Sequence, residues 1–278
     1  MHLNPKLEQR AVQAILWIFT LITIFILFFI IFYILRKGLP VISSAFLTTN
    51  PTDMGKSGGI YSTIIGTIAL TIGALIVATP LGVGTAIYLN EYTRESRITK
   101  VIRFGSECLA GIPSIIFGLF GFILFVTKLK MGWSILSGSL TMAFMLLPTI
   151  IRTSEEALKS VPYNYREVSY SLGGTKWQTV TKVVFPSALP GILTGIILSI
   201  GRSVGETAAT IFTAGSALRM PTSVFSSSRS MAVHFYILAR EGISMPNAYG
   251  TAAVLIITIL FINIISYRMM HQFMKKYS

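Results

Sequence analysis

Residues 162–190, PYNYREVSYSLGGTKWQTVTKVVFPSALP, form a polar segment between two strongly apolar stretches of the chain. Three apolar side chains recur at helical spacing in its first half: Tyr165, Val168 and Leu172. Gly173 and Gly174 follow directly, and glycine ends helices because it adopts the left-handed conformation without a Cβ clash. The first half therefore predicts a short helix with one apolar face, opened by Pro162, whose missing N–H costs nothing at a first helical position.

The second half of this segment predicts another helix. Thr175 is followed three residues later by Gln178, which is the spacing of a capping box. The helix then has an apolar stripe of its own, formed by Trp177, Val180 and Val184. Pro186 and Pro190 close it. A helix–turn–helix is thus predicted between two membrane spans, with apolar side chains directed out of the membrane, and such a surface favours a protein partner.

The composition is that of a polytopic membrane protein. Of 278 residues, 53% are hydrophobic and 12% are charged, and the mean hydropathy is +0.70. The apolar content suffices for about six helices of about 20 residues, the length that crosses a bilayer. The net charge of +13 lies mainly between the apolar stretches, without the basic and aromatic surface typical of nucleic-acid binding.

Cysteine and histidine give no sign of a disulfide or a metal site. Cys108 is the single cysteine and excludes an intrachain disulfide. The histidines lie far apart at His2, His234 and His271, so no pair has metal-ligand spacing. We interpret them as surface residues and predict no metal site.

Six apolar runs of spanning length follow one another along the chain: residues 14–35, 60–89, 105–126, 133–151, 188–212 and 247–267. Six spans place both termini on one side of the membrane. That side, which also holds the polar segment, has fourteen basic residues in its loops and tails, against eight on the other side. Because basic loops stay in the cytoplasm, the predicted fold is all-α, with six transmembrane helices, cytoplasmic termini and a cytoplasmic helix–turn–helix.

The fifth predicted span carries charges that are costly inside a membrane. Arg202 and Glu206 are four residues apart, and hence on one face of the predicted helix, and Glu107 lies near the cytoplasmic start of the third span. Arginine offers a planar fork of N–H donors that matches an oxyanion. We therefore predict an anion path lined by Arg202, Glu206 and Glu107, with Ser203 and Thr207 as hydroxyl donors. Mutual neutralisation of Arg202 and Glu206 is the structural alternative.

Small residues recur four apart in the same span, at Gly191, Gly195, Ser199 and Ser203. This spacing lets helix backbones approach closely. The sequence leaves open whether the close neighbour is another helix of this chain or a partner subunit.

No enzymatic device is recognisable in the chain. Gly55-Lys56-Ser57 is similar to the end of a phosphate-binding P-loop, but Asn50 stands where that motif needs its first glycine. A membrane-embedded enzyme would need a metal set or a nucleophile with its base, and neither appears. A stand-alone secondary transporter, which also uses helices broken by glycine and proline, would leave the helix–turn–helix unexplained.

The polar segment resembles the cytoplasmic loop of permease subunits of ABC importers, whose pattern is E-A-A-x3-G-x9-I-x-L-P. Glu167, Gly173 and Pro186 stand at that spacing, while Val and Ser replace the two alanines. The resemblance implies a coupling helix that docks into a groove on an ATPase subunit. The residues expected to couple are Glu167, Gly173, Gly174, Trp177, Val183, Phe185 and Pro186.

The run Arg202 to Ala208 resembles the R-x-x-G-E-T-A signature of phosphate importer permeases, and residues 172–178 are similar to their L-G-A-T-x-W segment, with Gly174 for alanine. Of the two paralogous permeases, PstA and PstC, residues 62–67 and Asn263 are more similar to the PstA type, although Ala209 replaces its usual proline. A PstC-type subunit, or a permease for another oxyanion such as sulfate or molybdate, is the alternative.

The resemblance implies a non-catalytic subunit that forms the path for inorganic phosphate in the inner membrane of a bacterium. Its expected partners are a PstC-type permease, two PstB-type ATPases and a PstS-type phosphate-binding protein, besides membrane lipid. The chain itself is expected to hold no cofactor, since ATP and Mg would bind to the ATPase. The expected domains are an N-terminal helix with an external loop (1–59), the permease domain (60–270) with its coupling loop (152–187), and a cytoplasmic tail (271–278).

Overall fold

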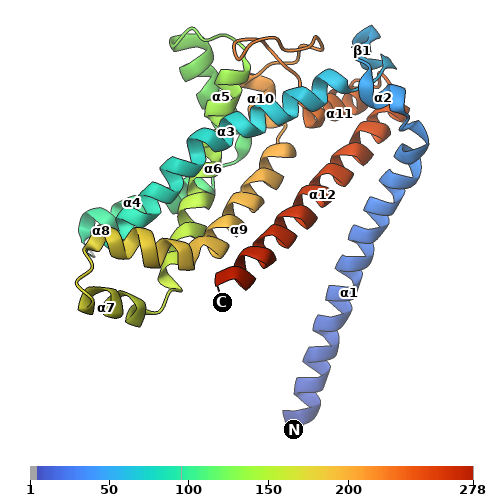
Figure 1. Ribbon diagram of the computed structural model, residues 1–278. Helices are drawn as coiled ribbons and strands as arrows, with labels where there is room; N and C mark the ends of the chain where they lie inside the picture. Colours follow the sequence, from blue (N-terminus) through green and yellow to red (C-terminus); the bar gives the residue numbers. More distant parts are fainter. Residues whose placement is uncertain (1–4, 95, 278) are drawn as a thin grey trace.

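The computed structural model describes residues 5–94 and 96–277, which form a bundle of tilted helices with a small two-stranded β-sheet at one end (Figure 1). The first half contains α1 (Pro5–Gly38), η1 (Leu39–Val41), α2 (Ser44–Thr48), β1 (Pro51–Thr52), η2 (Asp53–Gly55), β2 (Ser57–Gly58), α3 (Tyr61–Ile87), η3 (Tyr88–Tyr92), α4 (Arg97–Ala110), α5 (Ser114–Gly121) and η4 (Phe122–Lys128). The second half contains α6 (Ile135–Lys159), α7 (Tyr163–Ser171), α8 (Lys176–Thr179), η5 (Val180–Val184), α9 (Phe185–Val204), α10 (Ala208–Thr213), α11 (Met231–Arg240) and α12 (Met245–Tyr277). The single two-stranded sheet of the described residues pairs β1 antiparallel with β2, with Pro51 opposite Gly58.

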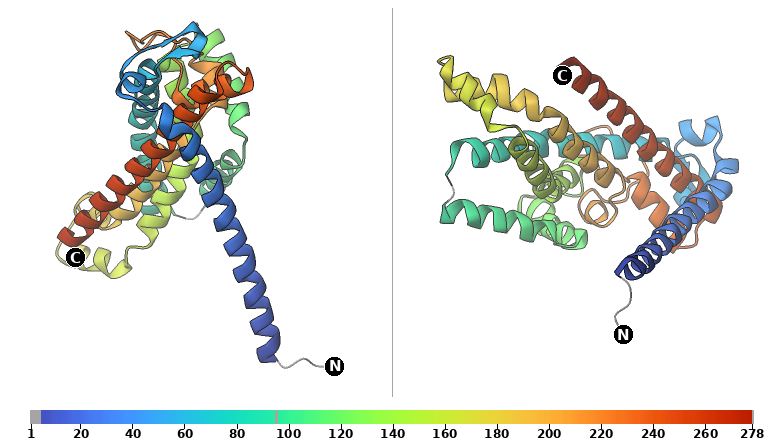
Figure 2. Two further views of the ribbon diagram at one scale, coloured as in Figure 1. Left: turned by 90° about the vertical axis from the view of Figure 1, so that its right-hand side faces the viewer. Right: turned by 90° about the horizontal axis from the view of Figure 1, so that it is seen from below.

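The predicted all-α membrane fold is confirmed. Within the described part of the chain, five helices are long and apolar enough to cross a membrane, and there are six spans if the bent pair α4 and α5–η4 counts as one. The α7–α8 hairpin and both ends of the described chain lie at one end of the bundle, whereas β1, α2 and α11 lie at the other (Figures 1 and 2). The helix–turn–helix is therefore on the same side as the termini, as six crossings require.

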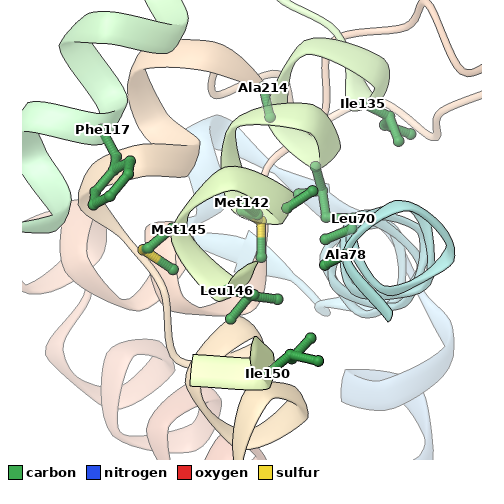
Figure 3. Packing of buried hydrophobic residues seen from close by; sticks show 11 residues of the cluster. Leu70, Ala78, Phe117, Ile135, Met142, Met145, Leu146, Ile150 and Ala214 are labelled. Atoms are coloured by element: carbon green, nitrogen blue, oxygen red, sulfur yellow. The ribbon is translucent and has the colours of Figure 1, made fainter. Parts of the chain in front are cut away.

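Helix α6 is the centre of the bundle, and α1 is its most exposed member. Buried side chains of α6, among them Met142, Leu146 and Ile150, pack against Leu70 of α3 and Phe117 of α5 (Figure 3). Close packing of this kind depends on small residues, because a Cβ on Gly138 would lie 2.7 Å from a methyl carbon of Leu70. Helix α1 instead diverges from the body and leaves its large apolar side chains exposed, as suits contact with lipid (Figure 2).

The third predicted span, residues 105–126, is not one straight helix. The chain bends by 102° between α4 and the α5–η4 unit. Pro113 sits directly before α5 with extended backbone angles (φ −59°, ψ 141°), and it lacks the N–H that a continuous helix would need. The N-terminal part of the predicted span therefore belongs to a separate amphipathic helix, α4, which starts at a capping box between Ser96 and Thr99.

The interpretation of His234 as a surface residue was wrong. Its side chain is 1% exposed on α11, against the turn that carries Gly55, where an added Cβ would lie 2.7 Å from the imidazole Cε1. Arg229 lies beside it, with Nη1 3.4 Å from Nδ1 of His234, and donates from Nε to the carbonyl of Ser216 at 2.9 Å. Burial, followed by the charge of Arg229, lowers the pKa of His234 to about 4.

Candidate functional site: the α7–α8 hairpin and the broken fifth span

The predicted helix–turn–helix is present as α7 and α8, but the prediction that Pro186 and Pro190 close its second helix was wrong, because that helix continues through η5 into α9. Gly173 has φ +79°, so the left-handed conformation that ends α7 is real, and its N–H donates to the carbonyl of Tyr170 at 2.9 Å. The N–H of Gly174 donates to the carbonyl of Ser169, also at 2.9 Å. The predicted capping box opens α8, because the N–H of Gln178 donates to Thr175 Oγ1 at 3.3 Å and Gln178 Oε1 accepts from the N–H of Thr175 at 2.9 Å.

The hairpin exposes apolar side chains on its outer surface. Leu172 is 84% exposed, Trp177 68% and Val168 60%. Beside them is an open groove of about 610 Å³ between α7 and the α8–η5 helix, lined by Tyr165, Val168, Ser169, Leu172, Gly174, Gln178, Lys182 and Val183. Contiguous apolar side chains outside a membrane mark an interaction surface.

The residues expected to couple to an ATPase fall into two groups. Glu167, Gly173 and Trp177 are exposed on the hairpin, and Gly174 and Val183 line its groove. Phe185 and Pro186 are half-buried at the start of α9, where Phe185 packs against a cluster that includes Ala86, Leu158 and Ile192. The second group therefore joins the hairpin to the bundle and does not lie on its outer surface.

The fifth predicted span ends earlier than expected. Helix α9 stops at Val204, and α10 begins at Ala208 after a break. Glu206 lies in that break and accepts from the N–H of Ala209 at 3.1 Å, which caps the short helix α10. The prediction that Arg202 and Glu206 share one helix face was wrong, because the helix on which it relied does not continue to Glu206.

Arg202 and Ser203 lie in the last turn of α9, with different surroundings. Ser203 is 3% exposed and donates to Thr71 Oγ1 of α3 at 3.0 Å. Arg202 is half-buried, and its guanidinium makes no hydrogen bond or ion pair with any residue that the structure describes, including Glu206. A guanidinium without a protein partner at the end of a membrane helix retains its donors for an anion.

A cavity of about 910 Å³ lies between α5, α10 and α11 and is lined by one of the predicted path residues, Thr207. Its wall is mostly apolar, with Trp133 and Phe212 on one side and Arg240 beside Tyr236 on α11. Glu107 is exposed on α4, beyond the bend at residues 111–113, and does not line this cavity. The structure therefore places the predicted path residues at a break in the fifth span, except for Glu107, which stands on a different element.

The small residues of α9 pack inside this chain. A Cβ added to Gly191 would lie 2.6 Å from Cβ of Ala157 on α6, and one added to Gly195 would lie 1.9 Å from Oγ1 of Thr153. The question left open by the spacing is settled for these two positions, because their neighbour is α6 of the same chain.

Sequence reasoning missed an ion pair at the root of the hairpin. Arg166 Nη2 donates to Glu91 Oε1 at 2.6 Å, and Nε donates to Oε2 at 3.2 Å. The two residues are 75 positions apart, and the sequence carries no signal that pairs them. From the sequence alone, Arg166 and Glu91 are recognisable only as charged residues of two separate polar loops.

Taken together, these features define a transmembrane subunit of a transporter: a helical bundle with a broken span and an exposed hairpin that presents apolar side chains to a partner. Residues 78–278 match the family described as "Binding-protein-dependent transport system inner membrane component". The chain belongs to this family, and the predicted class of ABC transporter permease is confirmed.

Curated relatives and solved structures agree with this membership. The chain is 31% identical to the "Probable ABC transporter permease protein YqgI" of Bacillus subtilis, over 94% of this chain and 95% of the relative. It is 32% identical to the "Phosphate transport system permease protein PstA" of Haemophilus influenzae, over 93% and 92%. A chain of the crystal structure of a bacterial alginate ABC transporter shares the fold with a TM-score of 0.66 and 15% identity, over 96% of this chain and 97% of that one.

Proposed function

We propose that this chain is the PstA-type permease subunit of an ATP-driven importer of inorganic phosphate. Several relatives with 32–37% identity are named phosphate transport permeases. The observation that carries the proposal is Arg202, a guanidinium without a protein partner among the described residues, placed in the R-x-x-G-E-T-A run where the fifth span breaks. A guanidinium binds a tetrahedral oxyanion through two parallel N–H donors and keeps its charge at every physiological pH.

In this proposal the path residues bind the phosphate anion only briefly while it crosses the membrane. Arg202 attracts the anion out of water, which offsets part of the cost of placing a doubly charged ion between apolar helices. Thr207 lines the adjoining cavity and supplies a hydroxyl donor, while Glu206 limits how tightly the site holds a dianion. Weak binding of this kind suits a path, because the anion must also leave.

The energy for transport comes from a partner. We propose that the α7–α8 hairpin docks on one of two PstB-type ATPase subunits, which bind ATP and Mg, and that a PstC-type permease and a PstS-type binding protein complete the importer. Closure of the ATPase dimer on ATP would move the hairpins together and open the path outward, and product release would reset it. The exposed apolar side chains of the hairpin, Leu172 and Trp177 above all, support this docking.

Orientation follows from charge. The hairpin and both ends of the described chain share one end of the bundle (Figure 1). By sequence, the loops and tails of that end carry most of the basic loop residues. The positive-inside rule therefore supports a bacterial inner-membrane protein with cytoplasmic termini and hairpin.

The test is uptake of radiolabelled phosphate by cells that lack this chain and by the same cells with the chain restored. Restored uptake that unlabelled phosphate competes away, and sulfate or molybdate does not, is the expected result. Restoration of sulfate or molybdate uptake instead would assign the subunit to another oxyanion. Uptake of phosphate at the normal rate without the chain, under phosphate limitation and with no other phosphate carrier present, would refute the proposal.

A further inference from the structure

Helix α7 is held to the bundle in an unusual way. Of its nine residues, Arg166 is the one that is buried, whereas Tyr163, Tyr165 and Val168 are all more than half exposed. Most surface helices are held by an apolar stripe that faces their own core. In α7 the apolar side chains point outward, so a polar contact must fix its position.

That contact is the pair formed by Arg166 and Glu91, whose side chains are 10% and 6% exposed. Both carboxylate oxygens accept hydrogen bonds, and Glu91 Oε1 also accepts from Nδ2 of Asn90 at 2.7 Å. Arg166 donates in addition to two carbonyls, from Nη2 to Leu158 in the last turn of α6 at 3.2 Å and from Nη1 to Val161, just beyond that helix, at 3.0 Å. A bidentate pair whose two partners are each held by further hydrogen bonds fixes orientation as well as distance.

The pair joins α7 and the end of α6 to an element that lies 75 positions earlier in the chain. Arg166 belongs to α7, the two carbonyls to the last turn of α6 and the residues just after it, and Glu91 to η3, the π-helical end of α3. A second contact runs parallel to it, because Nζ of Lys176 on α8 lies 5.2 Å from the centroid of the Tyr92 ring, directly after Glu91. Both helices of the hairpin are therefore fastened to the same end of α3.

Helix α3 leads from this junction to the anion path. It packs along α6, and further along it Thr71 accepts the hydrogen bond of Ser203, the neighbour of Arg202. A displacement of the hairpin that is passed to Glu91 would therefore act on the helix whose Thr71 contacts Ser203 of the path directly.

We propose that Glu91 and Arg166 form the positioning link through which movement of the docked hairpin reaches α3 and the anion path. This inference rests on the proposed function, in which an ATPase moves the hairpin. The link is a positioning pair and touches neither phosphate nor ATP.

The experiment uses the complete importer, reconstituted in lipid nanodiscs, with ATP hydrolysis measured with and without the phosphate-loaded binding protein. In Arg166→Lys the charge stays but the fork is lost, and we expect the stimulation of hydrolysis to fall at least tenfold while basal hydrolysis and recovery of the ATPase with the complex are unchanged. Glu91→Gln should behave in the same way, and the double variant Glu91→Gln/Arg166→Gln should regain part of the stimulation, since two amides can pair without a buried unpaired charge. Glu156→Gln is the matched control, because it breaks the exposed pair with Arg152 on α6 and should leave stimulation unchanged.

A distance measurement separates this link from general damage and from failure of the proposed function. Spin labels on Ser171→Cys and Tyr88→Cys, in a Cys108→Ser background, report the position of α7 relative to the end of α3 in this chain alone. The wild-type pair should give one narrow distance distribution, and Arg166→Gln should broaden it. Normal stimulation in Arg166→Lys, or a distribution that stays narrow in Arg166→Gln, would overturn the positioning link. Failure of the unmutated chain to assemble with any ATPase would overturn the proposed function instead, whatever the spin labels report.

Discussion

The double variant Gly191→Ala/Ala157→Gly moves one methyl group from α6 to α9, and it tests whether these helices pack as closely as the structure shows. A Cβ on Gly191 would lie 2.6 Å from Cβ of Ala157, whereas its distance to Cα of Ala157 would be 3.4 Å. Carbon atoms in contact are about 3.5–4.0 Å apart, so the first distance is an overlap and the second is close to an ordinary contact. The steric conflict of Gly191→Ala therefore comes almost entirely from one methyl group, and Ala157→Gly removes it.

The magnitudes follow from this geometry. Overpacking in Gly191→Ala costs about 2 kcal/mol, and the better helix propensity of alanine returns about 1 kcal/mol, so the net loss is about 1 kcal/mol. Ala157→Gly loses about 1 kcal/mol of propensity and about 0.8 kcal/mol for a buried methyl group. The double variant only moves the methyl group from one helix to the other and should be within about 0.5 kcal/mol of the original chain, against a sum of nearly 3 kcal/mol for independent changes.

The assay is thermal unfolding of the four proteins in one nanodisc composition, followed by tryptophan fluorescence. At about 2–4 °C per kcal/mol for a chain of this size, each single variant should unfold a few degrees early, and the double variant should unfold close to the original temperature. A double variant less stable than either single variant would show that Gly191 and Ala157 do not touch. The close α6–α9 contact, and the position of the hairpin that these two helices carry, would then be wrong.

Three further outcomes follow from the structure. Arg202→Ala should abolish phosphate uptake while membrane insertion and assembly, checked by purification of the complex, stay normal; full uptake would dismiss the anion role. Gly173→Val should reduce stimulated ATP hydrolysis several-fold, because valine does not tolerate the φ of +79° at this position. Gly173→Asn should retain most of the stimulation, since open space surrounds the position of the added Cβ and asparagine tolerates this conformation. Equal activity of the two variants would show that the backbone conformation is irrelevant. Because burial lowers the pKa of His234 to about 4 from 6.5, the unfolded chain binds more protons between these values. The free energy of unfolding is therefore unaffected by His234 above pH 6.5 and falls by about 3 kcal/mol in all as the pH falls to about 4. His234→Gln should flatten the dependence of the unfolding temperature on pH over this window. An unaltered profile would assign the effect to another group.

Much of the architecture follows from patterns that act over a few residues. The apolar runs predict the spans because a bilayer demands about 20 apolar residues in a helix, whatever the neighbours are. The hairpin is equally local: the left-handed glycine at 173 and the capping box of Thr175 and Gln178 act within one turn of helix. These elements were therefore predictable before any packing was known.

The breaks in the third and fifth spans mark the limit of such patterns. An apolar run that contains glycine and proline still predicts one continuous span. In the structure, however, Pro113 divides the third run and the break at residues 205–207 divides the fifth. Whether a helix continues through such a point depends on what satisfies the freed backbone groups. Glu206 does this for α10, and its use as a cap removed it from the helix face on which the sequence placed it.

The sequence by itself determined an all-helical membrane fold with a glycine-closed hairpin and a charged fifth apolar run, because hydropathy, capping and charge bias are local properties, and its motifs indicated the permease family. The tertiary structure alone decided that Gly191 and Gly195 face α6, that His234 is buried beside Arg229, and that Arg166 meets Glu91. The physical reason is that the free energy of a buried charge or a close contact is set by the group opposite, and that group comes from a part of the chain with no local relation to it.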